Sequence, residues 1–379
     1  MYFLFWFSAL LIVYTYALYP VFIYLLATFF PKETIKIDAV DDVTVVVIVY
    51  NEVARIEKKI KDILSSNYPK EKLQILVVSD GSDDATKTVV ESLELSNVTF
   101  LENSERRGKA ACLNDAFSNT QTELVVLTDV RQTFEPDAIK NMLACLSDPD
   151  VGAVSGELHF SSTEHTGEEN KFSQSVDAYW QYETFIRAKE SEFFSAIGVT
   201  GAIYAIRKSL FQAIPDNTVL DDVLIPMNVV MQGKRVLFES SAIAYDIPSS
   251  DSAREETRKI RTLAGNYQLV ALRPDLIKPW CNPAIIQYIS HKLLRLVMPV
   301  FLAVLLLSSF LLMAEHWFYV LAFLGQTFFY LLPIIENKIN HPLFKKIVSI
   351  RNAFVSMNMY AYKAMIEFFT NKNLHLWKK

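Results

Sequence analysis

The sequence has few cysteines and no excess of basic charge. Its 379 residues include three cysteines, Cys112, Cys145 and Cys281, which lie far apart and form no CxxC or Cys/His pattern. This argues against a disulfide framework and a cysteine-held zinc ion, and it fits a reducing compartment. Acidic side chains outnumber basic ones by 42 to 37. A general nucleic-acid binder carries a basic surface, so we expect no nucleic-acid partner.

Charge is missing altogether from the first apolar stretch. No charged residue occurs between Tyr2 and Phe30, and this length exceeds the roughly 20 residues that a helix needs to cross a bilayer. A secretory signal peptide would begin with a basic region and end at small residues. Here no lysine or arginine precedes the stretch, which ends in Phe29, Phe30 and Pro31. We therefore expect an uncleaved transmembrane anchor over residues 1–31.

Two further uncharged runs lie near the other end of the chain. We expect membrane spans at about 294–314 and 317–335, which form an antiparallel hairpin because only a short break separates them. Basic residues flank the pair on both sides, and the positive-inside rule places such flanks in the cytosol. Residues 40–280 then form a cytosolic domain, and residues 281–379 form a C-terminal membrane region. The flanking residues are Lys292, Arg295, Lys338, Lys345 and Lys346.

The last apolar segment, Ile347–Phe369, leaves two interpretations open. It contains Arg351, Lys363 and Glu367, which are costly at the centre of a bilayer, and a basic tail follows it. A helix that lies on the cytoplasmic leaflet accommodates both features. A fourth span would instead carry the basic tail to the outside.

Strands and helices alternate through the middle of the chain. The β-branched run Val43–Tyr50 is typical of a strand that is covered on both faces. Such alternation predicts an α/β fold with a mostly parallel sheet, in which ligands bind beyond the carboxyl ends of the strands. The next strands are expected at 73–79, 98–102 and 123–128, and helices are expected from about Ile56, Ala85 and Gly108.

Acidic side chains follow three of these strands. Glu52 follows the first strand, Asp80 the second and Asp129 the fourth. We expect Asp80 and Asp129 to share one cleft, whereas Asp83 and Asp84 fit a turn or a helix N-cap. The phosphate-binding motifs GxGxxG and GxxxxGK[ST] are both absent. The site is therefore expected to hold its ligand through carboxylates and a metal ion.

Six segments carry a resemblance to a known family. They are VTVVVIVYNE (43–52), ILVVSDGSDDAT (75–86), RRGKAACLN (106–114), LTDVRQTFEPDAI (127–139), GVTGAIYAIRKSLF (198–211) and LDDVLIPMNVVMQGKRV (220–236). Residues 43–265 resemble the family 2 glycosyltransferases, inverting enzymes with nucleotide-sugar donors, in the membrane-bound branch similar to cellulose, chitin and hyaluronan synthases. This resemblance implies a Rossmann-like GT-A domain with a mixed, mostly parallel sheet and transmembrane helices at both ends.

The resemblance implies roles for residues at the strand ends. Asp129 matches the metal-binding aspartate of the family's DxD motif, and Mg²⁺ or Mn²⁺ prefers such oxygen ligands. Arg131 replaces the second aspartate. Either water and the diphosphate complete the metal shell, or Arg131 offsets charge itself, or it forms a surface salt bridge. The nucleotide-sugar donor is expected to contact Tyr50, Glu52, Asp80 and Lys109.

The resemblance also implies a general base and a diphosphate-binding pair. Asp222 matches the base that takes the acceptor hydroxyl proton, with Asp221 orienting it or contacting nearby groups; an N-cap pair is the alternative. Arg258 and Arg261 lie where processive synthases carry a QxxRW motif, and they would grip the diphosphate, face anionic lipid, or do both. Thr262 replaces the tryptophan of that motif, which favours a limited number of transfers.

Residues between the donor half and the base are less specific. The segment 171–194 predicts an amphipathic helix whose aromatic side chains stack on an acceptor sugar, rest at the membrane interface or pack in the core. Gly198 and Gly201 are expected to permit close backbone approach near the acceptor. His291 is expected to be a structural or interfacial histidine.

The apolar ends and the resemblance together predict a membrane glycosyltransferase of the hexosyl or N-acetylhexosaminyl class. It would transfer a sugar with inversion from a UDP-sugar to a lipid-linked or membrane-proximal glycan in polysaccharide biosynthesis. The expected location is a bacterial inner or cell membrane, with the catalytic domain cytoplasmic and in contact with membrane lipids and other glycan-assembly proteins. The alternatives are a processive polysaccharide synthase, a transferase to polyprenyl phosphate and an inactive nucleotide-sugar-binding scaffold.

Overall fold

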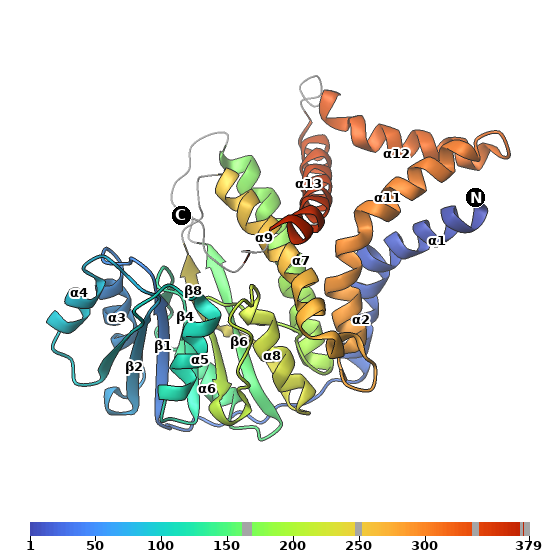
Figure 1. Ribbon diagram of the computed structural model, residues 1–379. Helices are drawn as coiled ribbons and strands as arrows, with labels where there is room; N and C mark the ends of the chain where they lie inside the picture. The colour runs from blue at the N-terminus through green and yellow to red at the C-terminus, as the bar shows by residue number, and fades with distance from the viewer. Residues whose placement is uncertain (161–168, 247–251, 336–340, 372–373, 375–379) are drawn as a thin grey trace.

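An α/β domain occupies one side of the molecule, and long helices from both ends of the chain project from the other side (Figure 1). Strands and helices alternate in the domain as the sequence predicts. Lys338, expected in a cytosolic loop, lies outside the described residues. The computed structural model describes residues 1–160, 169–246, 252–335, 341–371 and 374.

The core of the domain is one mixed sheet. Its strands are β1 (Val43–Val49), β2 (Leu73–Ser79), β3 (Val98–Glu102), β4 (Leu124–Thr128), β5 (Thr133–Phe134), β6 (Val151–Phe160), β7 (Tyr204–Arg207) and β8 (Arg235–Asp246). The eight strands lie in the order β3-β2-β1-β4-β7-β6-β8-β5. The pairs β1–β2, β1–β4, β2–β3 and β6–β8 are parallel, whereas β4–β7, β6–β7 and β5–β8 are antiparallel. The expected mixed, mostly parallel sheet is therefore confirmed.

Helices cover both faces of this sheet. They are α3 (Ile56–Leu64), α4 (Thr86–Ser92), α5 (Lys109–Asn119), α6 (Ala138–Cys145), α7 (Glu169–Phe193) and α8 (Asp221–Met231), while α9 (Ser252–Leu272) packs against α13 and the segment before α8. Strand β1 is buried along its whole length. Its side chains alternate between the two faces, because successive residues of a strand point in opposite directions. Val46 and Ile48 pack with α5 and α8, whereas Val45 and Val47 pack with α3 and α6.

The apolar ends of the chain form long helices. The first runs from Tyr2 to Phe29 as α1 (Tyr2–Val13), a π-helical turn and α2 (Tyr19–Phe29). A second helix, Ile285–Leu311, contains α10 (Ile285–Gln287), another π-helical turn and α11 (Leu294–Leu311). By length and composition both could cross a bilayer. The next apolar helix, α12 (Trp317–Ile335), is the second half of the expected hairpin.

The far end of this helical bundle is aromatic. The Tyr2 hydroxyl donates a hydrogen bond to Glu315 Oε2 (3.3 Å), which joins the start of α1 to the α11–α12 turn. The rings of Trp6 and Phe318 stack with centroids 5.5 Å apart, and Trp317 is exposed. Tryptophan and tyrosine are enriched where membrane helices meet water. The cluster therefore fits a membrane–water interface at this end.

The last helix lies along the domain. α13 (Pro342–Thr370) packs beside α9, and the Lys363 Nζ forms an ion pair with Glu256 (2.5 Å). Arg351 Nε donates to the Phe329 carbonyl at the end of α12 (3.2 Å). These basic groups are satisfied by the domain and by a helix end. The helix also packs against α11, so it contacts both the domain and the apolar helices.

A buried ionic cluster joins the apolar helices to the domain. His291 lies between two α7 carboxylates, with its Nδ1 3.0 Å from Glu190 Oε1 and its Nε2 2.9 Å from Glu183 Oε2. Tyr19 from α2 donates to Glu190 (2.5 Å), and Arg295 pairs with Glu183. Buried charges are tolerated only when they are paired in this way. His291 thus has a structural position, as expected. We call these five residues the junction cluster.

The junction cluster should be a main source of stability. Replacing His291 with leucine leaves two glutamates without their shared partner, so we expect a loss of about 3 kcal/mol in the free energy of unfolding. The unfolding temperature of the full chain in detergent micelles measures this effect. His159→Leu is the control, because His159 is about two-fifths exposed on β6 and its loss should change little. Equal unfolding temperatures for the two variants would contradict the prediction.

Candidate active site

The carboxyl ends of three parallel strands meet at one edge of the sheet. The register pairs Val49 of β1 with Ser79 of β2, and Val47 of β1 with Thr128 of β4. Tyr50, Asp80 and Asp129 follow these positions directly. The structure therefore brings them to one edge of the sheet, as the sequence predicts. This is the edge where ligands bind in open α/β sheets.

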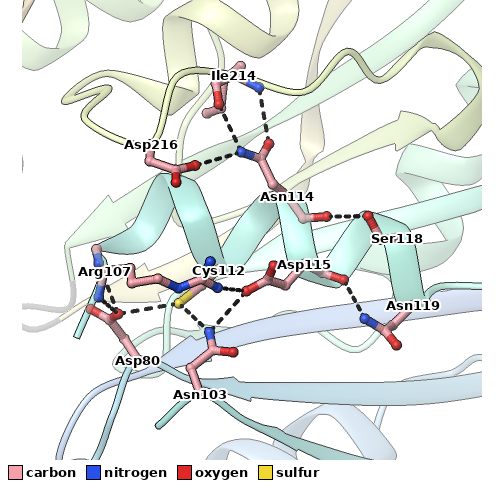
Figure 2. Close-up of polar contacts among 11 residues, drawn as sticks. Asp80, Asn103, Arg107, Cys112, Asn114, Asp115, Ser118, Asn119, Ile214 and Asp216 are labelled. Carbon is pink, nitrogen blue, oxygen red and sulfur yellow. Dashed lines mark hydrogen bonds and ion pairs between the residues drawn. The ribbon is translucent and has the colours of Figure 1, made fainter. Parts of the chain in front are cut away.

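Asp80 anchors the segment that precedes α5. Its carboxylate is buried, and Oδ1 accepts hydrogen bonds from the backbone N–H groups of Arg107 (2.7 Å) and Gly108 (2.9 Å). Figure 2 shows the Asp80 carboxylate beside Arg107 and Cys112 at the start of the helix. A carboxylate is favourable there because the first N–H groups of a helix lack intrahelical partners. This contact fixes the position of Lys109, the first residue of α5.

A neighbouring contact was not predicted from the sequence. The Arg106 guanidinium lies 4.2 Å from the centre of the Tyr50 ring, and Arg106 Nε is 4.0 Å from Asp80 Oδ2. A Cβ on Gly81 would lie 2.9 Å from the Arg106 backbone nitrogen, so the two loops pack too closely for any other residue. Glu52 pairs with Arg55 (2.8 Å). The only sequence signal for Arg106 was its place in the RRGKA segment.

Asp83 and Asp84, which follow β2, make hydrogen bonds within the loops at this edge. Asp83 and Asn51 exchange two hydrogen bonds, of 2.6 and 3.0 Å. Asp84 accepts hydrogen bonds from the N–H groups of Thr86 (3.0 Å) and Val53 (3.2 Å). Of the two interpretations, the turn is the one seen for Asp83 and Asp84, since Ala85 is the N-cap residue of α4.

Lys109 joins two carboxylates from distant parts of the chain. Its Nζ lies 3.1 Å from Asp129 Oδ1 and 3.3 Å from Asp221 Oδ2. Burial lowers the pKa of Lys109, but Asp129 and Asp221 outweigh burial and hold this pKa well above its ordinary value. The lysine is therefore a permanent cation between the end of β4 and the start of α8. The hydroxyl of the buried Tyr204 lies in the same group and makes no hydrogen bond within the described residues.

Asp222 lies next to this triad. Its backbone oxygen accepts a hydrogen bond from Val199 N (2.9 Å), and a Cβ on Gly201 would lie 3.6 Å from Asp222 Cβ and 3.8 Å from Lys109 Nζ. These are ordinary contact distances, and a Cβ on Gly198 would likewise lie 3.5 Å from its nearest atoms, so a close approach that only glycine allows is not seen at either expected position. Burial, followed by the Asp221 carboxylate, raises the pKa of Asp222 to about 6. Asp222 is half-buried. With a pKa of about 6, its carboxylate changes protonation just below neutral pH.

Helix α5 also contacts the segment that precedes α8 and Asp222. Asn114 Nδ2 donates to the Ile214 carbonyl (2.8 Å), and Ile214 N donates back to Asn114 Oδ1 (3.0 Å). Asp216 accepts a further hydrogen bond from Asn114 Nδ2 (3.1 Å), as Figure 2 shows. The helix therefore holds Lys109 at its start and the approach to α8 along its side. One helix therefore carries the residue that pairs with Asp129 and contacts the segment that precedes Asp221 and Asp222.

Arg131 forms a salt bridge with the last residue of β8. Its Nη2 lies 2.9 Å from Oδ2 of the buried Asp246 on β8, which also accepts from Gln132 Nε2 (2.8 Å). This agrees with the salt-bridge interpretation. Asp129 Oδ2 makes no hydrogen bond or ion pair among the described residues. No three His, Cys, Asp or Glu side chains gather as a metal site in that part of the chain.

One free carboxylate oxygen is enough for part of a metal shell. Mg²⁺ is commonly bound by one or two protein carboxylates, with substrate phosphates and water completing its shell. Asp129 fits such a partial site, because its second oxygen is free and its side chain is 38% exposed. The residues present are therefore compatible with a metal that arrives with a diphosphate.

Arg258 and Arg261, the predicted diphosphate-binding pair, have different environments in the structure. Arg261 Nε donates to the Leu374 carbonyl (3.0 Å). Burial lowers the pKa of Arg261, and the Asp221 and Asp222 carboxylates act in the other direction, so this guanidinium lies near both carboxylates. Arg258 and Thr262 are exposed on α9. Arg261 is thus close to the site, whereas Arg258 faces solvent.

Loss of the Asp80 anchor should destabilise the domain. Asp80→Ala leaves the N–H groups of Arg107 and Gly108 without their acceptor, and an unpaired buried donor costs about 2 kcal/mol. We expect a lower unfolding temperature for the full chain in micelles. Asp42→Ala is the matched control, because Asp42 is 62% exposed and its ion pair with Lys72 lies at the surface. If the Asp80 variant unfolds at the wild-type temperature, the carboxylate does not anchor this segment.

Comparison with known proteins agrees with this geometry. Residues 44–214 match the model of the family described as Glycosyl transferase family 2. The chain is 22% identical over 249 residues to the poly-beta-1,6-N-acetyl-D-glucosamine synthase of Staphylococcus aureus, which covers 63% of this chain and 58% of the relative. It is 23% identical over 225 residues to the probable glycosyltransferase YdaM of Bacillus subtilis, which covers 57% and 53%. The chain thus spans little more than half the length of these curated relatives.

One solved structure has the same fold over nearly the whole chain. It is the mannosyltransferase PcManGT from Pyrobaculum calidifontis, determined in complex with GDP-Man and Mn²⁺. The TM-score is 0.72 at 22% identity, and the superposition covers 97% of this chain and 99% of the other. This likeness confirms the GT-A fold. The match to the family model over residues 44–214 shows that the chain contains a glycosyl transferase family 2 domain.

Proposed function

We propose that this protein is a membrane glycosyltransferase that transfers one sugar, with inversion, from a nucleotide-sugar to a lipid-linked or membrane-proximal glycan. The observation that carries the proposal is the convergence of Lys109, Asp129, Asp221 and Asp222 at the carboxyl edge of a family 2 domain. A UDP-sugar is the proposed donor. The structural relative with GDP-Man supports a nucleotide-sugar and makes a GDP-sugar the competing donor.

Asp222 is the proposed general base. Inversion by direct displacement requires one base on the acceptor side. The acceptor hydroxyl oxygen bonds to the anomeric carbon while its proton passes to the Asp222 carboxylate. The bond between that carbon and the diphosphate oxygen breaks, and the nucleoside diphosphate leaves with the electron pair. A pKa near 6 suits this role, because the group is ionised at neutral pH and still basic enough to accept a proton.

The donor diphosphate is proposed to lie beside Lys109 and Asp129. Lys109 supplies a permanent positive charge, and lysine binds phosphate as a point charge. Asp129 would hold Mg²⁺ or Mn²⁺, which supplies charge neutralisation for the leaving group when bound. The arginine–tyrosine pair of Arg106 and Tyr50 lies at the same edge and offers a surface for the base of the nucleotide.

The apolar helices support a location at a membrane, with the domain on the cytosolic side. The helices Tyr2–Phe29 and Ile285–Leu311 are long and apolar enough to cross it. A processive polysaccharide synthase is the second candidate, because one relative is named as a poly-N-acetylglucosamine synthase. The exposed Thr262 disfavours it, since the position lacks the ring that packs beside the acceptor in processive enzymes. Long products from the purified protein would establish the second candidate instead.

Removal of the base should abolish transfer. Asp222→Asn cannot accept the hydroxyl proton, so we expect at least a hundredfold loss of acceptor-dependent UDP release, while calorimetry shows that donor still binds. In the wild type, kcat/KM should fall about tenfold per pH unit below about 6, because protonation of Asp222 removes the base.

The control is Asp83→Asn, since Asp83 serves a turn and should retain full turnover. An Asp222→Asn enzyme with wild-type turnover would show that another group accepts the proton.

Asp129 should couple metal binding to donor binding. Asp129→Ala removes the free carboxylate oxygen, so we expect the Kd for UDP to rise at least tenfold in the presence of Mn²⁺. The difference between titrations with Mn²⁺ and with a chelator should disappear in this variant. Unchanged UDP affinity in calorimetry would count against a metal role for Asp129.

A further inference from the structure

A buried lysine on α3 takes no part in the proposed mechanism. The side chain of Lys59 is fully removed from solvent. Its Nζ donates a hydrogen bond to the Gln132 carbonyl (2.8 Å) and lies 3.9 Å from the centre of the Phe134 ring. Asp62, one turn further along α3, pairs with it at 3.7 Å. Burying an ammonium group is costly unless its charge is compensated, so these contacts hold Lys59 in place.

The contacts of this turn of α3 go to the segment that follows Asp129. That segment, residues 130–134, leads from the end of β4 into the short strand β5. Lys59 binds one of its carbonyl groups. The Asp62 carboxylate accepts a hydrogen bond from the backbone nitrogen of Phe134 (3.1 Å to Oδ2). One turn of α3 therefore fixes the main chain of the segment at both a carbonyl and an N–H group.

Strand β8 holds the same segment through side chains. Arg131 Nη2 lies 2.9 Å and Gln132 Nε2 lies 2.8 Å from Oδ2 of Asp246. The segment is thus held by α3 through its main chain and by β8 through two of its side chains. The main-chain contact of Lys59 is made three residues after Asp129. Because the positions of successive backbone atoms depend on one another, this contact constrains where the Asp129 side chain begins.

The position of Asp129 matters more here than in a motif with two aspartates. Arg131 stands at the second position and pairs with Asp246, so Asp129 alone is available from this motif to a metal ion. Groups that orient a metal ligand without touching the metal commonly contribute ten- to a hundredfold to metal affinity. Burial lowers the pKa of Lys59 to about 8, and the Asp62 and Asp129 carboxylates oppose this shift. The buried ammonium is therefore within electrostatic reach of Asp129.

We propose that Lys59 is the positioning residue for Asp129, which it holds in a metal-binding position by fixing the segment 130–134 through the Gln132 carbonyl. The proposal rests on the proposed function, because the metal role of Asp129 belongs to it. Lys59 is fully buried, so it acts through the segment and not by contact with the donor. Its role differs from that of Lys109, which is proposed to bind the diphosphate directly.

Nucleotide binding with and without a metal tests this role without requiring turnover. The full chain in micelles is titrated with UDP in a calorimeter, once with Mn²⁺ and once with a chelator, and GDP replaces UDP if the wild type binds it more tightly. Lys59→Met keeps most of the apolar stem and removes the ammonium group. We expect the Kd with Mn²⁺ to rise at least tenfold, while the Kd with the chelator stays within about twofold of the wild-type value. A lysine that only stabilises the fold would leave the ratio of the two Kd values unchanged.

A matched control and a second variant accompany Lys59→Met. Lys61→Met is the control, because Lys61 lies on the same helix, is 65% exposed and pairs with Glu57 at the surface; both Kd values should stay unchanged. The second variant combines Lys59→Met with Asp62→Leu and decides the question if the single variant does not fold. Replacing both members of a buried ion pair with apolar side chains is often neutral or stabilising. Because both contacts to the segment are lost, we expect the same rise of the Kd with Mn²⁺.

The outcomes also separate this proposal from the proposed function. Equal Kd values with Mn²⁺ in the wild type and the Lys59 variants would overturn the positioning role, as would an equal rise with Mn²⁺ and with the chelator, or a wild type whose binding does not respond to Mn²⁺. A protein with Mn²⁺-dependent binding that requires Lys59, but without sugar transfer, retains the positioning role and loses the transferase assignment. A protein that transfers a sugar while its Lys59 variants bind the nucleotide as the wild type does has the opposite result.

Discussion

The ammonium group of Lys109 between Asp129 and Asp221 is the interaction on which the site depends. Without a cation, the end of β4 and the start of α8 would bring two carboxylates together and repel each other. With it, the three groups attract, and the first turn of α8 is held against the sheet edge. Asp222 is the next residue along that turn. The position of Asp222, the proposed base, is therefore set by the ion pair of the neighbouring Asp221 with Lys109.

The lysine is in turn positioned by Asp80. That carboxylate is buried under the N-terminus of α5 and accepts two backbone hydrogen bonds. The side chain of Lys109 starts directly after this anchor. Asn114, further along α5, holds the segment before α8. Helix α5 thus connects the ends of β2 and β4 to the start of α8. A change at Asp80 that moves α5 would therefore also move Asp222.

Much of the fold could be predicted because its signals are local. The run Val43–Val49 is apolar at nearly every position, and such a run is stable only between helices on both faces of a sheet. Lys109, Asp129 and Asp221 were predicted from their motifs, and the structure brings them together. The pairing of Arg131 with Asp246 spans 115 positions and has no local pattern, so three interpretations stayed open.

The same limit explains what the sequence did not predict. Lys292 looked like one of several basic residues flanking an apolar run. Only the folded chain places it near Asp222, because the contacts of the His291 ring with Glu183 and Glu190 orient that turn of the helix. Arg187 lies in the segment 171–194, for which the sequence predicted roles only for the aromatic side chains. Side chains that meet through tertiary contacts leave no periodicity to detect.

The junction cluster limits how the domain can move relative to the apolar helices. Glu183 and Glu190 of α7 contact His291 and Arg295 of one apolar helix and Tyr19 of the other. A hinge between the two parts would have to break these buried polar contacts, and each group left without its partner would raise the free energy of the open form. The distance between Asp222 and the apolar helices is therefore held by buried contacts rather than by a flexible linker.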